Sequence, residues 1–178
     1  SIADRRLTSE GAVASALIKL LALPGSRLTV VQLLDILSLT PVRRRYDLEE
    51  ADLATIRLWL EQTRVRWGLD EQDRLNLGLP GYRANSWRAG LERLLLGYAM
   101  SDTHGKLFNN ILPFDDMEGT PVQSLGKLID FINRVEQTVT VLNRARSLRE
   151  WGGQLHVLLT DLFLRMTIPP VKLPLFRK

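Results

Sequence analysis

The 178-residue sequence contains no cysteine and only two histidines, His104 and His156. The lack of cysteine excludes disulfide bonds, thiol chemistry and most structural zinc sites, and it fits a cytoplasmic protein. Each histidine lacks a second ligand residue at metal-binding spacing, so the sequence predicts no imidazole metal site. No segment matches G-x-x-x-x-G-K-[ST], which excludes a P-loop nucleotide site of that type in this stretch.

Long apolar runs are absent as well. None reaches the roughly 18 residues that a membrane-spanning helix requires, and the N-terminal "SIADRRLTSE" does not have the form of a signal peptide. We therefore expect no membrane partner. The sequence has no initiator methionine and ends in the proline-containing "IPPVKLPLFRK". We expect an excised fragment of a longer chain that forms a single helical domain over residues 1–178, with residues 168–178 as an extended connection.

The composition is that of a globular protein with a weak basic bias. Hydrophobic residues make up 45% of the chain and charged residues 25%, which is enough apolar material for a buried core. Lys and Arg number 24 against 20 Asp and Glu, for a formal charge of +4. This bias suits nucleic acid or an acidic partner without distinguishing between them.

Capping residues and apolar spacing both predict helices. Four helix starts pair a capping residue with Glu or Gln three positions later: Thr29 with Gln32, Asp47 with Glu50, Thr120 with Gln123, and Ser147 with Glu150. Helical apolar stripes follow Val13, Ala16, Leu17, Leu20 and Leu21; Leu53, Ile56 and Leu60; Val122, Leu125, Leu128, Ile129, Ile132, Val135, Val139 and Leu142; and Leu148, Trp151, Leu155, Leu158, Leu159 and Leu162. No sustained alternation predicts strands, so the expected class is all-α, a multi-helix domain with long irregular connections.

The connections between these helices are punctuated by glycine and proline. We expect residues 23–27, 40–47, 67–85 and 101–119 to lie outside helices. Acidic residues gather in two of them, as Asp70, Glu71 and Asp73, and as Asp115, Asp116 and Glu118. Either group could in principle hold a divalent cation, but turn and helix-start positions favour solvated carboxylates. The sequence therefore predicts no catalytic, cofactor-binding or metal-binding residues.

Basic residues beside aromatic rings are the remaining candidates for function. They are Arg43, Arg44 and Arg45 before Tyr46, Arg64 and Arg66 before Trp67, and Arg83 and Arg88 around Trp87. Such arginines could contact phosphates while the rings stack on unpaired bases. The alternative is solvated arginines and buried tryptophans, which we favour for Trp59, Trp87 and Trp151 because they lie in helical stripes. For Arg43 to Arg45 both readings stay open.

The segment "NSWRAGLERLLLGYAM", residues 85–100, is the clearest single helix in the sequence. Asn85 or Ser86 would cap it. Helical spacing places Trp87, Leu91, Leu94, Leu95 and Tyr98 on one face, with Arg88 and Arg93 off that face. We expect a packing stripe here and no DNA-contacting surface.

Six segments resemble the RecC family, the gamma subunit of exodeoxyribonuclease V. They are "SIADR" (1–5), "SRLTVVQLLDILSLTPVRRRYDL" (26–48), "VRWGLD" (65–70), "LGLP" (77–80), "NSWRAGLERLLLGYAM" (85–100) and "ILPFDDMEG" (111–119). The most specific of them are R-W-G-L-D and W-R-x-G-L-x-R-L-L-L-G-Y-A-M. Beyond residue 119 only a general helical pattern continues.

The resemblance implies a non-catalytic role within a larger machine. RecC is similar to a superfamily 1 helicase without its ATP site, and it joins RecB-like and RecD-like subunits. That complex uses ATP and Mg to unwind and degrade double-stranded DNA ends, binds single-stranded DNA and responds to Chi. This segment looks like the helical 2B-type insertion, which would act mainly as a scaffold and partner surface with secondary DNA contact. The resemblance places the nuclease site in RecB and the Chi-reading residues mainly in parts of RecC that match no motif in this sequence, so none of those residues is assigned here.

Three alternatives remain open at this point. A freestanding DNA-binding domain would need a concentrated basic face, whose DNA affinity would fall steeply with salt. A protein-interaction module would bind through apolar surface, with an affinity that depends weakly on salt. The third is the equivalent 2B domain of an active helicase subunit.

Overall fold

The computed structural model describes residues 2–99, 107–108, 111–114 and 122–163, with side chains given from residue 11 to residue 160. The described residues form α1 (Ile2–Leu21), α2 (Val30–Ser38), α3 (Thr40–Tyr46), α4 (Glu50–Gln62), α5 (Glu71–Asn76), α6 (Trp87–Ala99), α7 (Val122–Leu142) and α8 (Leu148–Phe163). Their sheet content is one isolated bridge between Phe108 and Ile111. The expected all-α class is confirmed.

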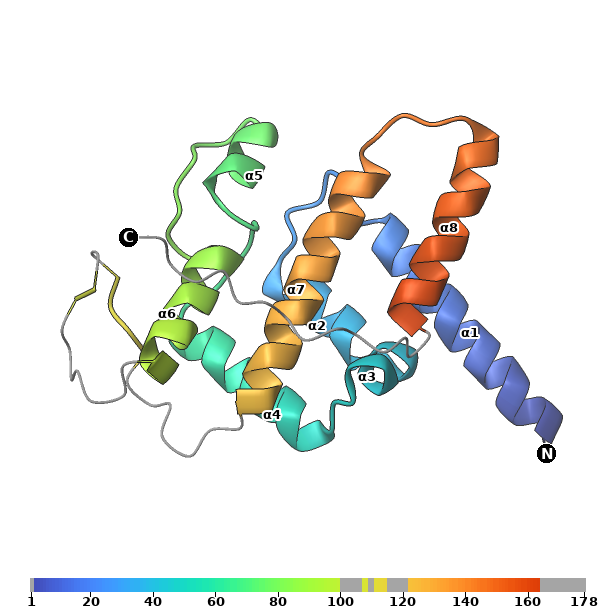
Figure 1. Ribbon diagram of the computed structural model, residues 1–178, viewed down its shortest axis with the longest axis horizontal. Coiled ribbons are helices and arrows are strands. Elements are labelled where there is room, and N and C mark those ends of the chain that lie inside the picture. Colours follow the sequence, from blue (N-terminus) through green and yellow to red (C-terminus); the bar gives the residue numbers. More distant parts are fainter. Residues whose placement is uncertain (1, 100–106, 109–110, 115–121, 164–178) are drawn as a thin grey trace.

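Helix α7 crosses the middle of the molecule, with α6 on one side of it and α8 on the other (Figure 1). It packs against α4 and α6, while α3 contacts α1, α2 and α8. The short helix α5 lies above α6, at the top of the view. The segments that precede α2, α5 and α6 are joined by backbone hydrogen bonds, such as those from the Gly68 N–H to Arg27 O and from the Trp87 N–H to Gly68 O.

Two of the expected helix starts are confirmed. At α2, the Gln32 N–H donates to Thr29 Oγ1 at 3.2 Å and the Thr29 N–H donates to Gln32 Oε1 at 2.9 Å. At α8, the Ser147 N–H donates to Glu150 Oε2 at 2.8 Å. Each pair satisfies amides that the first helical turn leaves without partners. The pair of Thr120 and Gln123 lies partly outside the described residues.

Two expected connections contain helices. The expectation for residues 67–85 was wrong at α5 (Glu71–Asn76), a short helix that Asp70 caps. The expectation for residues 40–47 was wrong as well. They form helix α3, and Asp47 ends it in a left-handed conformation (φ 52°, ψ 47°) instead of starting the next helix. The start of α4 uses Glu49, whose N–H donates to Asp52 Oδ2 at 2.8 Å. Proline is tolerated in a first helical turn because the missing N–H has no partner there. Val42 and Tyr46 then face the core at helical spacing, a pattern that the run of arginines between them concealed.

One buried cluster joins all the longer helices. Its fully enclosed side chains include Leu20, Leu33, Ile36, Leu53, Ile56, Leu60, Trp87, Leu94, Leu125, Leu128 and Phe131. Tyr46 meets Phe131 edge to face, with ring centroids 5.7 Å apart. Tryptophans 59 and 87 are buried as expected, and Trp151 is partly buried against the cluster. The stripes were wrong at their ends: Leu21, Tyr98, Val122 and Leu148 are exposed, because each lies in the last or first turn of its helix.

Two glycines on α6 permit close packing. A Cβ at Gly90 would overlap the side chain of Val65, and a Cβ at Gly97 would overlap the backbone of Phe114. The two glycines are seven residues apart, so they lie on one face of the helix. Helix α6 is thus pressed against the loop before α5 and against residues 111–114.

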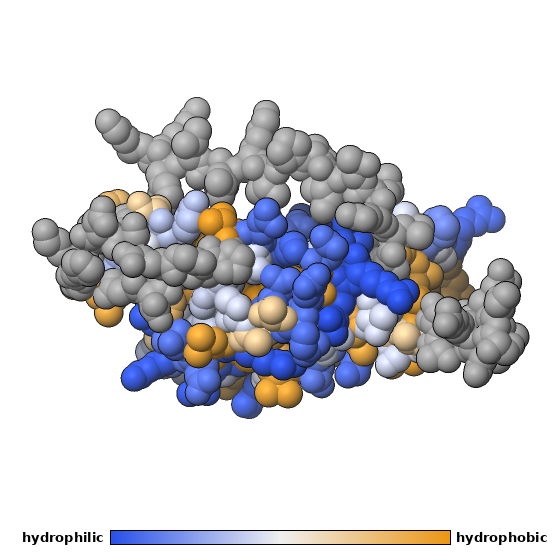
Figure 2. Space-filling model, turned by 90° about the horizontal axis from the view of Figure 1, so that it is seen from below, coloured by the Kyte–Doolittle hydropathy of each residue, from blue (hydrophilic) through white to orange (hydrophobic). Residues whose placement is uncertain are grey.

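The lower face of the molecule is mostly hydrophilic where it is visible, and its apolar residues appear as separate small areas (Figure 2). Within the described part of the chain, no helix combines the length and apolar character needed to cross a membrane.

Replacing Trp87 by alanine should destabilise the fold by about 3–5 kcal/mol, since its indole is 1% exposed and the truncation leaves a cavity. Urea unfolding measures the change. The matched control is Tyr98→Ala. Tyr98 also lies on α6 but is 47% exposed, so its removal should change stability little. Equal effects of the two substitutions would contradict this description of the core.

Candidate nucleic-acid interface

The three arginines of α3 do not form one basic surface. Arg43 pairs with Glu50, with Nη1 2.9 Å from Oε2. Arg45 is 9% exposed and its guanidinium lies 5.7 Å from the centre of the Tyr46 ring. Arg44 is exposed to solvent. A helix turns successive side chains by about 100°, so these three neighbours point in different directions.

Arg64 and Arg66, unlike the arginines of α3, are alike in their exposure to solvent. Both are exposed on the connection that leaves α4, and no ion pair joins either of them to a carboxylate among the described residues. Val65 between them is buried against Gly90. The Arg66 N–H donates to Asn85 O at 2.8 Å and its carbonyl accepts from the Val30 N–H at 3.0 Å. Within the described part of the chain these two arginines thus lack a carboxylate partner, while backbone hydrogen bonds hold the segment that carries them.

Trp67, which follows them, is already covered by cations. The guanidinium of Arg74 lies 4.2 Å from the centre of its ring and that of Arg27 lies 5.7 Å away. Arg74 is 5% exposed, and it donates to the carbonyls of Trp67 (2.9 Å) and Tyr82. Intramolecular cation–π contacts therefore occupy this ring.

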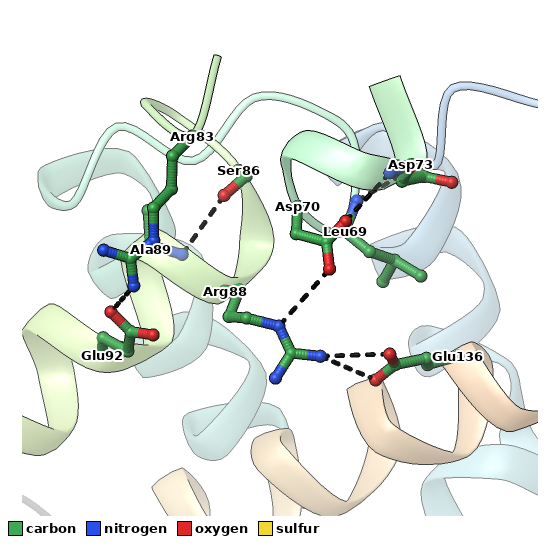
Figure 3. A network of polar contacts seen from close by, with 9 residues as sticks. All are labelled: Leu69, Asp70, Asp73, Arg83, Ser86, Arg88, Ala89, Glu92 and Glu136. Carbon is green, nitrogen blue, oxygen red and sulfur yellow. Dashed lines mark hydrogen bonds and ion pairs between the residues drawn. The ribbon is translucent and has the colours of Figure 1, made fainter. Parts of the chain in front are cut away.

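Arg83 and Arg88 are both paired with carboxylates (Figure 3). Arg83 pairs with Glu92 of α6. The guanidinium of Arg88 lies between Asp70 and Glu136, with Nε 3.7 Å from Asp70 Oδ2 and Nη2 3.0 Å and 3.1 Å from the two Glu136 oxygens. Arg88 thereby connects the start of α6 to the start of α5 and to α7. Because it is half exposed, this network should add only modest stability.

The acidic residues around α5 serve the helix start. Asp70 caps α5 by accepting the Asp73 N–H at 2.9 Å. Asp73 Oδ2 accepts the Leu69 N–H at 3.0 Å. Burial raises the pKa of Asp73, as does the negative charge of Asp70, while the hydrogen bond from the Leu69 N–H and the positive charge of Arg74 oppose the rise. In the part of the chain that the structure describes, no three such side chains are placed to hold a metal ion. Asp115, Asp116, Glu118 and His104 lie outside it.

The pKa of Asp52, at the start of α4, is lowered, whereas that of Asp73 is raised. Burial alone would raise its pKa, but hydrogen bonds from Ser124 and from the Glu49 N–H, together with the charge of Lys127, lower it. Asp52 thus fixes α4 to α7, since Ser124 and Lys127 both belong to α7.

Two further arginines hold the structure together in ways that the sequence did not reveal. Arg74 is the buried guanidinium described above. Arg93 reaches from α6 to two carbonyls, donating from Nε to Leu112 O at 3.0 Å and from Nη1 to Thr63 O at 3.2 Å. Both bind backbone carbonyls, which leave no mark in a residue pattern. For Arg74 one trace in the sequence is Gly68, at which a Cβ would lie 3.2 Å from Arg74 Nε.

Comparisons with known proteins identify relatives of the chain. The family described as "RecBCD enzyme subunit RecC fourth domain" matches residues 10–167. The chain is similar to "RecBCD enzyme subunit RecC" from Mycobacterium tuberculosis (strain CDC 1551 / Oshkosh), with 36% identity over 150 residues, which is 84% of this chain. It is also similar to the protein of that name from Escherichia coli (strain K12), with 33% identity over 164 residues, or 92% of this chain. In both cases the chain spans 14% of the relative's length.

The Asp73→Asn substitution tests whether the surroundings of Asp73, at the start of α5, raise the pKa of its carboxyl group. The amide keeps an oxygen to accept the Leu69 N–H but removes the charge. Because the folded-state pKa of Asp73 is raised, its stabilising contribution is present below the unfolded value of 3.8 and is lost as pH rises through the folded pKa. We expect the variant to be more stable, relative to the parent, at neutral pH than at about pH 3.

Urea unfolding of both proteins at the two pH values measures this difference. A difference that is independent of pH, or that has the reverse sign, would show that Asp73 is not destabilised by its surroundings.

Proposed function

Since this chain belongs to the RecC family, we propose that it is the non-catalytic helical domain of an exodeoxyribonuclease V gamma subunit. The observation that carries the proposal is the match of the RecC fourth domain to residues 10–167. The domain acts as a scaffold and as a surface for other subunits. Its place in the parent protein is that of a helical 2B-type insertion in a superfamily 1 helicase-like region.

The wider role follows from the same premise. The parent subunit works with RecB-like and RecD-like partners in the cytoplasm, where the complex unwinds and degrades double-stranded DNA ends and supports Chi-dependent recombinational repair. ATP and Mg belong to the motor and nuclease subunits of that complex. This domain helps to hold the subunits in place and provides surface for contacts with them.

The use of its arginines supports a scaffold. Arg74 and Arg93 bind backbone carbonyls, and Arg88 joins three helices through Asp70 and Glu136. A guanidinium group that already binds carbonyls or carboxylates within the domain has fewer N–H donors left for a phosphate. Most of the conspicuous cations near α5 and α6 therefore maintain the shape of the domain.

A domain exchange tests the proposed role. The matched segment of Escherichia coli RecC is replaced by this chain, and the hybrid subunit is expressed with its RecB and RecD partners. We expect assembly of the complex and DNA unwinding, because the chain aligns over 92% of its length with that protein. The control hybrid carries the Trp87→Ala substitution, which should reduce assembly. A hybrid with a folded domain that fails to assemble would contradict the proposal.

DNA contact by exposed arginines is a second candidate function, favoured by the conformation of Arg64. Its φ of 58° lies in the left-handed region at the end of α4, where glycine is usual. A residue with a Cβ costs roughly 1–2 kcal/mol in this conformation. The arginine at this position is exposed and has no carboxylate partner among the described residues, which favours a use for its charge. Of the arginines predicted from the sequence, Arg66 and Arg44 are also exposed and would act with it. Arg43, Arg45, Arg83 and Arg88 would contribute less because they are paired or buried.

Arg64→Gly separates stability from DNA binding. Glycine accepts the left-handed conformation, so we expect stability to stay the same or to rise by up to about 1 kcal/mol. Binding to a forked duplex with a single-stranded tail should weaken, and the slope of log affinity against log salt should fall by roughly 0.7–0.9 for one lost phosphate contact. Fluorescence anisotropy measures both quantities.

Arg149→Ala, which removes an exposed charge from α8, is the control for a general charge effect. If both variants bind as tightly as the parent, or if both lose the same affinity, Arg64 is not a specific DNA contact.

A further inference from the structure

Exposed apolar side chains gather around residues 107–114, which lie beside the end of α6 at the left of the view (Figure 1). Leu107 is 65% exposed, and Phe108, Leu112 and Tyr98 are between 42% and 47% exposed. We call these four side chains the apolar surface. Large apolar groups that cluster in contact with water are typical of sites where a protein meets another surface.

The base of this segment is fixed to α6 by three contacts. The Phe114 side chain is buried, and its backbone N–H donates to Arg93 O at 3.0 Å. The Arg93 side chain donates in turn from Nε to Leu112 O at 3.0 Å. Gly97 leaves the space that the Phe114 carbonyl occupies, since a Cβ at Gly97 would overlap that oxygen. The segment is therefore held at one position along α6.

The outer part of the segment is hydrogen-bonded as well. The Phe108 N–H donates to Ile111 O at 2.9 Å, and the Ile111 N–H donates to Phe108 O at 2.8 Å. With the base held by Arg93, the backbone that carries Leu107 and Phe108 is ordered before any partner binds. A surface ordered in advance loses less conformational entropy on binding, which favours its use in an interface.

The chemistry of the segment favours a protein partner over nucleic acid. Its described residues, 107–108 and 111–114, are all apolar and carry no charge. The guanidinium of Arg93, which reaches the segment, donates to Leu112 O and Thr63 O. Binding of a phosphate backbone requires cations, whereas the buried centre of a permanent protein interface is apolar and poor in charge.

We propose that the apolar surface packs into an apolar groove of another domain of the same gamma subunit, with Phe108 as the aromatic anchor. The chain spans 14% of the length of its RecC relatives, so most of a RecC-like subunit lies outside it. A domain joined through the same polypeptide is present at a high effective concentration. The identity of that subunit rests on the proposed function.

A second copy of this chain, or a RecB-like or RecD-like subunit, could also offer an apolar groove. Each of these would have to bind from solution, without the high effective concentration of a covalently joined domain. The occupant that the length of the parent chain favours is therefore intramolecular, and the alternatives predict different cross-links.

The test places the photoreactive amino acid p-benzoylphenylalanine at position 108 of the full-length subunit. The purified subunit is irradiated without and with its RecB-like and RecD-like partners, and the cross-linked peptides are identified by mass spectrometry. We expect cross-links to another domain of the same subunit, formed already in the subunit alone and in equal yield when the partners are present. The same probe at position 71, where Glu71 is exposed on α5, controls for random proximity and should cross-link less.

A second measurement uses Phe108→Asp in the full-length subunit. A charge placed in an apolar interface should open it, so amide hydrogen exchange of residues 107–114 should become about tenfold faster. Exchange in the middle of α7 should not change, which shows that the domain stays folded. Leu75→Asp, a matched change at a residue 52% exposed on α5, should leave exchange at residues 107–114 unaltered.

Four results would overturn the inference: cross-links only to a RecB-like or RecD-like subunit, cross-links between two copies of the subunit, no cross-link at all, or unchanged exchange in the Phe108→Asp variant. Both measurements can be made on the subunit without its partners. Their failure is therefore distinguishable from failure of the domain exchange, which tests assembly of the complex.

Discussion

The indole of Trp87 is the contact on which the rest of the structure depends. Its ring is 1% exposed, and its N–H donates to Leu28 O at 2.8 Å across 59 residues of sequence. Beside it, the Trp87 N–H bonds to Gly68 O at 3.0 Å and the Arg66 N–H bonds to Asn85 O at 2.8 Å. The start of α6, the loop before α5 and the turn before α2 are thus joined at one place.

This junction determines which cations are exposed. It fixes the backbone on both sides of Val65, so Arg64 and Arg66 remain at the surface while Arg74 is enclosed behind Trp67. It also places Arg88 within reach of Glu136 on α7. A scaffold domain needs hydrogen bonds and ion pairs of this kind within it, because it has to hold its surfaces in a constant arrangement. The internal pairing of these arginines is what the proposed scaffold role requires.

The sequence predicted what local chemistry determines. Capping at Thr29 and Ser147 and the stripes of α4 and α7 were visible because a side-chain oxygen or a repeat of 3.6 residues leaves a pattern. Helix α3 was missed because three arginines obscured the spacing of Val42 and Tyr46. The roles of the arginines could not be predicted at all. Their partners are carboxylates and carbonyls up to 48 residues away, as for Arg88 and Glu136, and such pairs follow from packing.

Amide hydrogen exchange of the 178-residue chain would test the central claim most directly. If the junction at Trp87 is part of the core, the amides of Arg66, Trp87 and Arg88 should exchange as slowly as those in the middle of α7, although two of them lie at the border between loop and helix. Rapid exchange at these three amides, at the rate of exposed loops, would show that the junction opens independently. The arrangement of the arginines would then not be fixed by it.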